Sequence, residues 1–169
     1  MPSHHRLSIL ITVFILSAQN IMAGEIDDFS SDGCSQFPDG TFTQKNLWCD
    51  CCITHDIAYW QGGSLKLKKQ ADKALRACVL NKTNSFLLAN TMYFGVIVGG
   101  LPIFPTWYRW GYGWRYGRGF KSLNLFEKKK VEEKLKNYYT TNNPNTCDFE
   151  HPVKLLIEKK LQLLLPKRE

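Results

Sequence analysis

Six cysteines constrain this chain of 169 residues more than any other feature of its sequence. Four of them lie between Cys34 and Cys52, and the other two are Cys78 and Cys147. Six is an even number, and the cysteines of exported proteins pair in an oxidising compartment. Each bridge would stabilise the fold by very roughly 2–4 kcal/mol, because it restricts the unfolded chain. If the chain is exported, its cysteines can therefore form three disulfide bonds.

The N-terminal segment indicates export. Arg6 precedes an apolar run from Leu7 to Leu16, and small residues follow up to Ala23. This pattern is typical of a secretory signal peptide, so we expect residues 1–23 to be cleaved and the protein to be secreted or periplasmic. The run is too short to span a bilayer as a helix. A buried N-terminal helix and an uncleaved anchor are the alternatives.

Length and composition favour one ordinary globular domain over residues 24–169, because hydrophobic residues are 44% and charged residues 22% of the chain. The formal charge of +7 suits anionic membranes or nucleic acid and does not distinguish between them. Residues 24–63 carry seven acids and one base, whereas residues 64–121 carry ten bases and one acid. This asymmetry suggests a cation site in a protein that approaches anions, although an ordinary solvated surface would also explain it.

Hydrophobic periodicity predicts a mainly α protein. The expected helices are Leu47–Trp60, a second helix capped by Ser64 and ending near Leu80, Phe86–Val98, a charged surface helix over Lys128–Tyr139, and an amphipathic helix over Val153–Leu165. The stretch from Phe86 to Phe104 is the most apolar part of the chain. A membrane-spanning helix is the alternative there, but the pair Gly99-Gly100 favours a core helix that ends before it.

Aromatic residues alternate with glycine and arginine in the loop 105–120. Such side chains suit a membrane interface, and we expect docking on anionic bilayers. The residues expected to dock are Arg109, Arg115 and Arg118 beside Trp107, Trp110 and Trp114. The same composition could stack on nucleic-acid bases, or could simply pack over the core.

The segment from Cys51 to Tyr59 carries the residues best suited to chemistry. Residues four apart share one face of a helix, so Cys51, His55 and Tyr59 lie together, with Asp56 beside them. Asp72 stands six residues before Cys78. A Cys51–Cys78 bridge would hold two helices antiparallel and bring Asp72 toward His55. The carboxylate would fix the tautomer of the imidazole, and the other ring nitrogen could take a proton from water.

At these residues the sequence resembles the secreted phospholipase A2 superfamily. The family pattern is Cys-Cys-x-x-His-Asp-x-x-Tyr, followed by an aspartate six residues before a cysteine. The segment Asp32-Gly33-Cys34-Ser35 is also similar to the start of the calcium loop in short microbial and venom-type members. The resemblance covers about residues 32–80, and it leaves the apolar helix and the aromatic segment unexplained.

The resemblance implies an active site and a fold. His55 would be the general base, Asp72 would orient it, and Tyr59 would hydrogen-bond Asp72. The fold would have two antiparallel, disulfide-linked helices that carry the site, with further helices in a C-terminal tail over residues 126–169. The activity would be the hydrolysis of a phospholipid ester, with a phospholipid membrane surface as partner. No nucleic-acid partner is expected, and no particular protein partner is indicated.

The resemblance also implies a Ca²⁺ cofactor. Asp56 would give its carboxylate, and the backbone carbonyls around Gly33, Ser35 and Phe37 would complete the shell. The ion would polarise the ester carbonyl and bind the lipid phosphate. The loop departs from the family pattern over residues 36–40, where Pro38 has no N–H to donate.

The disulfide pairs that the resemblance implies are Cys51–Cys78 and Cys34–Cys52, which leaves Cys49 and Cys147 for the third bridge. Two alternatives remain open on sequence grounds. Cys49, Cys51, Cys52 and His55 could bind zinc instead. The whole chain could be a non-catalytic relative that keeps the fold and binds lipid or a protein.

Overall fold

The computed structural model describes residues 24–141 and residue 147, and within them the protein is mainly helical. Four helices follow one another: α2 (Cys49–Gln61), α3 (Leu65–Thr83), α4 (Phe86–Gly99) and α5 (Leu125–Thr140). The described residues form no strand, and Ile26 and Trp114 make an isolated β-bridge. The expected mainly α class is confirmed at this level. The predicted signal peptide and the predicted helix Val153–Leu165 lie outside the described residues.

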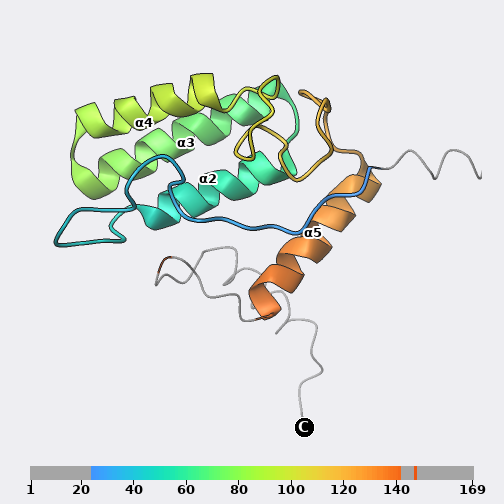
Figure 1. Ribbon diagram of the computed structural model, residues 1–169, viewed down its shortest axis with the longest axis horizontal. Helices are drawn as coiled ribbons and strands as arrows, with labels where there is room; N and C mark the ends of the chain where they lie inside the picture. The colour runs from blue at the N-terminus through green and yellow to red at the C-terminus, as the bar shows by residue number, and fades with distance from the viewer. Residues whose placement is uncertain (1–23, 142–146, 148–169) are drawn as a thin grey trace, which may run out of the picture.

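Helix α3 lies between α2 and α4 and runs antiparallel to both (Figure 1). Gly62 has a φ of 65° and ends α2. Ser64 caps α3 as expected, because its side chain accepts a hydrogen bond from the backbone of Leu67. The helix continues to Thr83 rather than ending near Leu80. Asn84 adopts the left-handed conformation and donates its N–H to the Leu80 carbonyl, which closes the last turn there.

Helix α5 is inclined to α2 and lies on the side of α2 away from α4 (Figure 1). It begins at Leu125, three residues before the expected start, because Asn124 and Glu127 form a reciprocal capping box. The side chain of Glu127 is 1% exposed and accepts two hydrogen bonds from Arg118, each of 2.9 Å. One face of the helix is buried through Val131, Leu135 and Tyr138.

Two hydrophobic clusters lie on opposite sides of α2. One cluster joins α2 to the N-terminal segment, to Trp114 and to α5, and it contains Ile26, Phe29, Ile53, Ile57, Trp60, Val131 and Leu135. The other joins α2 to α3 and α4, and it contains Trp48, Leu75, Val79, Ala89 and Met92. Helix α2 is therefore held on both sides, which fixes the side chains that it carries.

The aromatic segment packs against the protein, and three of the six residues expected to dock on bilayers, Arg109, Trp110 and Trp114, are buried. Trp110 and Trp114 are buried, and their ring nitrogens donate to the carbonyls of Gly63 and Gln61. Arg109 is also buried, and its guanidinium donates to two carbonyls of its own loop. These acceptors lie at the end of α2 and in the turn that follows it, and they hold the segment against the protein.

Three disulfide bonds join Cys34 to Cys52, Cys49 to Cys147 and Cys51 to Cys78, so all three expected pairs are confirmed. Their formation excludes the zinc alternative, because the sulfurs of its three cysteines are bonded to other cysteines. Among the described helices, none combines the length and the apolar character that crossing a membrane requires.

Candidate active site

Helices α2 and α3 bring together the three side chains expected to be catalytic and the carboxylate expected to bind calcium. His55, Asp56 and Tyr59 lie on α2, and Asp72 lies on α3. The Cys51–Cys78 bridge joins the two helices, with a Cα–Cα distance of 5.7 Å.

Asp72 is the centre of a buried hydrogen-bond network and is 2% exposed. One carboxylate oxygen, Oδ1, lies 3.2 Å from Nε2 of His55 and accepts a 2.7 Å hydrogen bond from the Tyr59 hydroxyl. The other, Oδ2, accepts a 2.9 Å bond from the ammonium of Lys68. Burial acts to raise the pKa of Asp72, but these three donors outweigh it and hold the pKa below its ordinary value. Asp72 is therefore an anion that accepts hydrogen bonds.

The charge of Asp72 determines which nitrogen of His55 carries the proton. An ionised carboxylate can only accept, so Nε2 bears the hydrogen that points to Asp72. Nδ1 is then the basic nitrogen, and it lies 3.9 Å from Oδ1 of Asp56. Burial acts to lower the pKa of His55, but the two neighbouring carboxylates outweigh it and raise the pKa. His55 is thus oriented on one side and basic on the other.

Lys68 is a member of the network that the sequence analysis missed. Its side chain is 2% exposed, and its ammonium donates to Asp72 and also, at 3.2 Å, to the carbonyl of Val96 on α4. The signal was present in the sequence. Lys68 stands four residues before Asp72, the one acid of α3, so helical spacing places the two charges on one face.

A cavity of about 250 Å³ opens beside His55. Its walls come from α2, α3 and α4 and from the loop that precedes α2. The lining residues include Gly33, Cys34, Ser35, Gln36, Phe37, His55, Asp56, Tyr59, Met92, Gly95, Val96 and Gly99. The structure therefore brings the expected base, the expected metal carboxylate and the expected carbonyl-bearing loop to one cavity.

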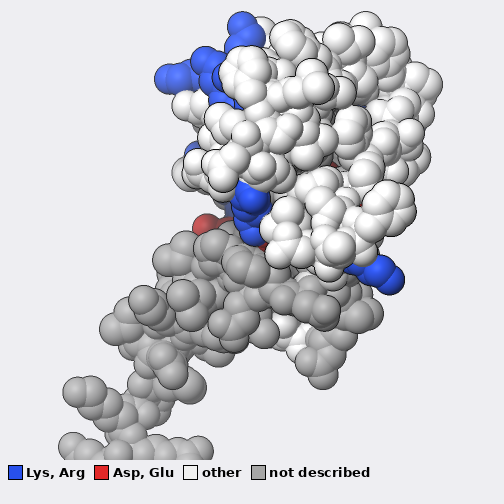
Figure 2. Space-filling view, turned by 90° about the vertical axis from the view of Figure 1, so that its left-hand side faces the viewer, with Lys and Arg blue, Asp and Glu red and all other residues white. Residues whose placement is uncertain are grey.

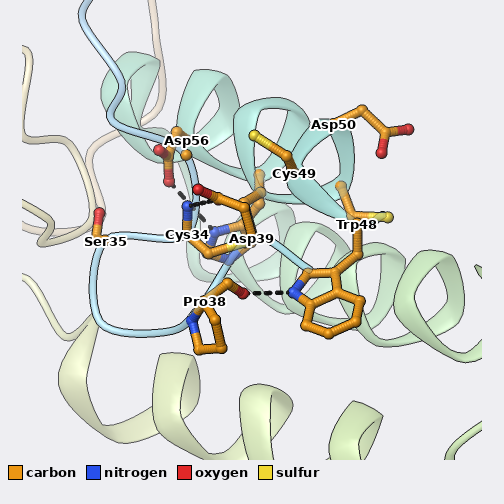
Figure 3. The surroundings of a disulfide bond; sticks show 12 residues. Cys34, Ser35, Pro38, Asp39, Trp48, Cys49, Asp50 and Asp56 are labelled. Atoms are coloured by element: carbon orange, nitrogen blue, oxygen red, sulfur yellow. Dashed lines mark hydrogen bonds and ion pairs between the residues drawn. A yellow bond between two sulfur atoms is a disulfide. The ribbon is translucent and has the colours of Figure 1, made fainter. Parts of the chain in front are cut away.

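The loop is held in place by the residues at which it departs from the family pattern (Figure 3). The Asp39 carboxylate accepts a 2.7 Å hydrogen bond from the backbone of Cys34, and the Pro38 carbonyl accepts a 2.7 Å bond from the ring nitrogen of Trp48. Gly33 has a φ of 87°, and a Cβ there would collide with the Asp39 carboxylate. Only glycine combines this positive φ with the absence of a Cβ, so only glycine fits at this position.

The residues expected to hold calcium fit that ion chemically. Asp56 and the carbonyl-bearing residues Gly33, Ser35 and Phe37 line the same cavity, and all would offer oxygen, which calcium requires. The Asp56 side chain is 17% exposed and accepts a 2.6 Å hydrogen bond from Ser31. Burial raises the pKa of Asp56, so its negative charge is poorly solvated. A cation in the cavity would relieve that cost.

Comparison of the chain with models of protein families, with curated proteins and with solved structures finds no match.

Proposed function

We propose that this protein is a secreted, calcium-dependent, phospholipase A2-like hydrolase of phospholipid esters. The observation that carries the proposal is the position of His55. One nitrogen of its ring is directed at the buried Asp72 carboxylate, and the other is on the side of a cavity lined by Asp56. The resemblance of residues 32–80 to the phospholipase A2 superfamily supports the same reading.

In the proposed reaction, Nδ1 of His55 takes a proton from water, and the oxygen of that water attacks the ester carbonyl. His55 then returns the proton to the alkoxide that leaves, which yields a fatty acid and a lysophospholipid. Asp72 stabilises the imidazolium between these two steps. The pKa of Tyr59 is raised by burial and by the Asp72 charge, so Tyr59 stays a neutral donor that fixes the carboxylate.

Asp56, with the backbone of Gly33, Ser35 and Phe37, would hold the calcium ion. When bound, calcium would polarise the ester carbonyl and neutralise charge on the lipid phosphate. The protein itself holds the Asp56 carboxylate 3.9 Å from Nδ1 of His55, the proposed general base. The cavity wall formed by Met92, Gly95 and other α4 residues would take the acyl chain.

Fatty-acid release from phospholipid vesicles tests the proposal. Wild-type protein should release fatty acid with calcium and should stop when a chelator is added. His55→Gln should lower the rate by about 10²–10⁴-fold, because it removes the general base while keeping a similar size. If wild-type protein neither binds calcium nor releases fatty acid, the non-catalytic binding module is the better account.

The metal ligand can be tested with a matched pair on one helix. Asp56 lies in the cavity, whereas Asp50 is paired with Lys82 through a 2.6 Å contact. Asp56→Asn should weaken calcium binding and activity together, with partial recovery at high calcium. Asp50→Asn should leave both unchanged. Isothermal titration with calcium reports binding separately from the hydrolysis assay, and equal calcium affinities in the two variants would argue against Asp56 as the ligand.

A further inference from the structure

Helix α4 is apolar on both of its faces, and the residues that the structure describes pack against only one of them. Its inner side packs against α3 through Ala89 and Met92, which are buried. Its outer side exposes Leu87 by 78%, Phe94 by 63% and Val98 by 62%. These three residues recur at helical spacing and form a stripe. A helix that is hydrophobic all round is normally buried on every side, so the outer stripe requires a partner.

The exposed surface continues beyond the helix into the loop that follows it. Ile103 is 67%, Phe104 is 38% and Trp107 is 58% exposed. From Thr83 to Tyr108 the chain contains no charged residue. Figure 2 views the end of the molecule where α4 begins, and uncharged residues cover much of the described surface there. Helix α4 with this loop therefore presents one continuous uncharged and largely apolar surface, which we call the α4 surface.

Basic side chains flank the α4 surface. Lys69, Lys73 and Arg76 recur every three or four residues along α3. Arg76 contacts α4 directly, because it donates to Asn90 and lies over the ring of Phe86, 5.4 Å from its centroid. An apolar surface bordered by cations matches the interfacial layer of a bilayer, where acyl chains lie beneath negatively charged phosphates. A protein partner would have to match both the apolar surface and its border of basic side chains, whereas a bilayer presents both features together.

The α4 surface also borders the candidate active site. Met92, Gly95, Val96 and Gly99 of the same helix form part of the cavity wall beside His55. Docking through the outer side of α4 would place this cavity at the lipid interface.

We propose that the α4 surface inserts into the interfacial layer of a phospholipid bilayer and places the cavity at its source of substrate. This inference rests on the proposed function for its choice of lipid as partner. The surface takes the place of the arginine- and tryptophan-rich segment that the sequence alone indicated, since Arg109, Trp110 and Trp114 of that segment are buried and only Trp107 belongs to the α4 surface.

Vesicle sedimentation tests the surface with a matched pair of double variants. F94S/V98S changes an aromatic and an aliphatic residue of the α4 surface. L125S/F126S makes the same kind of change at the start of α5, where Leu125 is 85% and Phe126 is 55% exposed. All proteins carry His55→Gln, so that hydrolysis cannot alter the vesicles. The vesicles are phosphatidylcholine with one-fifth phosphatidylserine. F94S/V98S should bind them at least about 10-fold more weakly than the His55→Gln parent does. L125S/F126S should bind them with an affinity within about 2-fold of that parent.

Trp107 provides a second readout of insertion. The other four tryptophans are buried at 4% exposure or less, so Trp107 is the one that lipid can reach. Phosphatidylcholine brominated on its acyl chains should quench the fluorescence of Trp107 in the His55→Gln protein, and the quenching should disappear when Trp107→Phe is added.

Equal binding of the two double variants, or no quenching of Trp107 in bound protein, would overturn the α4 surface as the lipid contact. A protein that ignores vesicles but dimerises through Phe94 and Val98 would overturn it as well and would make this face an interface between copies. Binding is measured without hydrolysis, so the two proposals can fail separately. If the wild-type protein binds vesicles but releases no fatty acid, the proposed activity is refuted and the α4 surface remains the lipid contact.

Discussion

At the residue scale, the network around Asp72 depends on a buried charge pair. Lys68 and Asp72 are both 2% exposed, and the lysine is the cation that faces Oδ2. A buried carboxylate that loses its cation is strongly destabilised, whereas removal of both charges is better tolerated. We expect Lys68→Met to lower the free energy of unfolding by about 3–5 kcal/mol.

The double variant Lys68→Met/Asp72→Asn provides the control for this prediction. Because it leaves no uncompensated charge, it should be more stable than the sum of the two single variants predicts. Urea denaturation of the four proteins measures this coupling. Strict additivity would show that the two side chains do not act as a pair.

Asp72 should affect turnover without affecting calcium. In Asp72→Asn the amide can offer an N–H to His55, which favours the tautomer that has no basic Nδ1. Turnover should fall by about 10²–10⁴-fold, because general-base catalysis requires that nitrogen. Calcium affinity should stay at its wild-type value, since the expected metal ligand is Asp56. A fall in calcium affinity that matches the fall in turnover would contradict this separation of roles.

At the element scale, the start of α5 is fixed by the Glu127 carboxylate. The hydrogen bonds from Arg118 lower the pKa of Glu127 below its ordinary value of 4.5. A lowered pKa stabilises the folded protein above pH 4.5, and this stabilisation is lost as the pH falls through the folded pKa. Glu127→Gln should therefore be less stable than wild type by about 1–3 kcal/mol at neutral pH, and the difference should vanish in acid. Urea denaturation of both proteins between pH 3 and pH 7 checks this, and a difference that does not change with pH would contradict it.

The aromatic segment is held to α2 by a close approach at Gly113. A Cβ at this position would collide with the ring of Trp60, whereas a Cβ at Gly95 of α4 would meet nothing within 4 Å. Gly113→Ala should cost about 1–3 kcal/mol, as overpacking does. Gly95→Ala should be neutral or stabilising, because alanine is the better helix former. Thermal denaturation compares the two substitutions directly.

The sequence predicted the elements better than it predicted their surroundings. Helices α2, α3 and α4 follow from hydrophobic spacing and from the caps at Gly62 and Ser64, which are local signals. The burial of Trp110 and Trp114 was not predictable in this way. Their acceptors are the carbonyls of Gly63 and Gln61, far away in the sequence.

In the candidate site, too, the residues that local spacing places together were predicted, and one that depends on distant packing was not. His55, Asp56 and Tyr59 share one face of one helix, so their proximity could be read from their spacing. Asp72 was placed beside them because a motif fixed its distance from Cys78. Lys68 was overlooked, since a lysine on α3 is normally solvated and only the packing of α4 over that helix encloses it.

At the scale of the whole molecule, the Cys49–Cys147 bridge closes the longest loop. It spans 98 residues of sequence, whereas Cys34–Cys52 spans 18. The entropy that a bridge removes from the unfolded chain grows with loop length, which gives about 4.7 kcal/mol for the long loop and about 3.2 kcal/mol for the short one. Both Cys49 and Cys147 are buried in the cluster on the α5 side of α2, so the bridge also joins that cluster covalently.

Removal of the long bridge should therefore destabilise the protein most while leaving the site intact. We expect Cys49→Ala/Cys147→Ala to lose about 1–2 kcal/mol more than Cys34→Ala/Cys52→Ala in urea denaturation. Activity below the unfolding transition should show the opposite order. Cys34 and Cys52 line the cavity, and their bridge ties the Gly33–Phe37 loop to α2, whereas Cys49 and Cys147 lie away from it. If the long-bridge variant loses activity and the short-bridge variant keeps it, the loop before α2 is not part of the catalytic machinery.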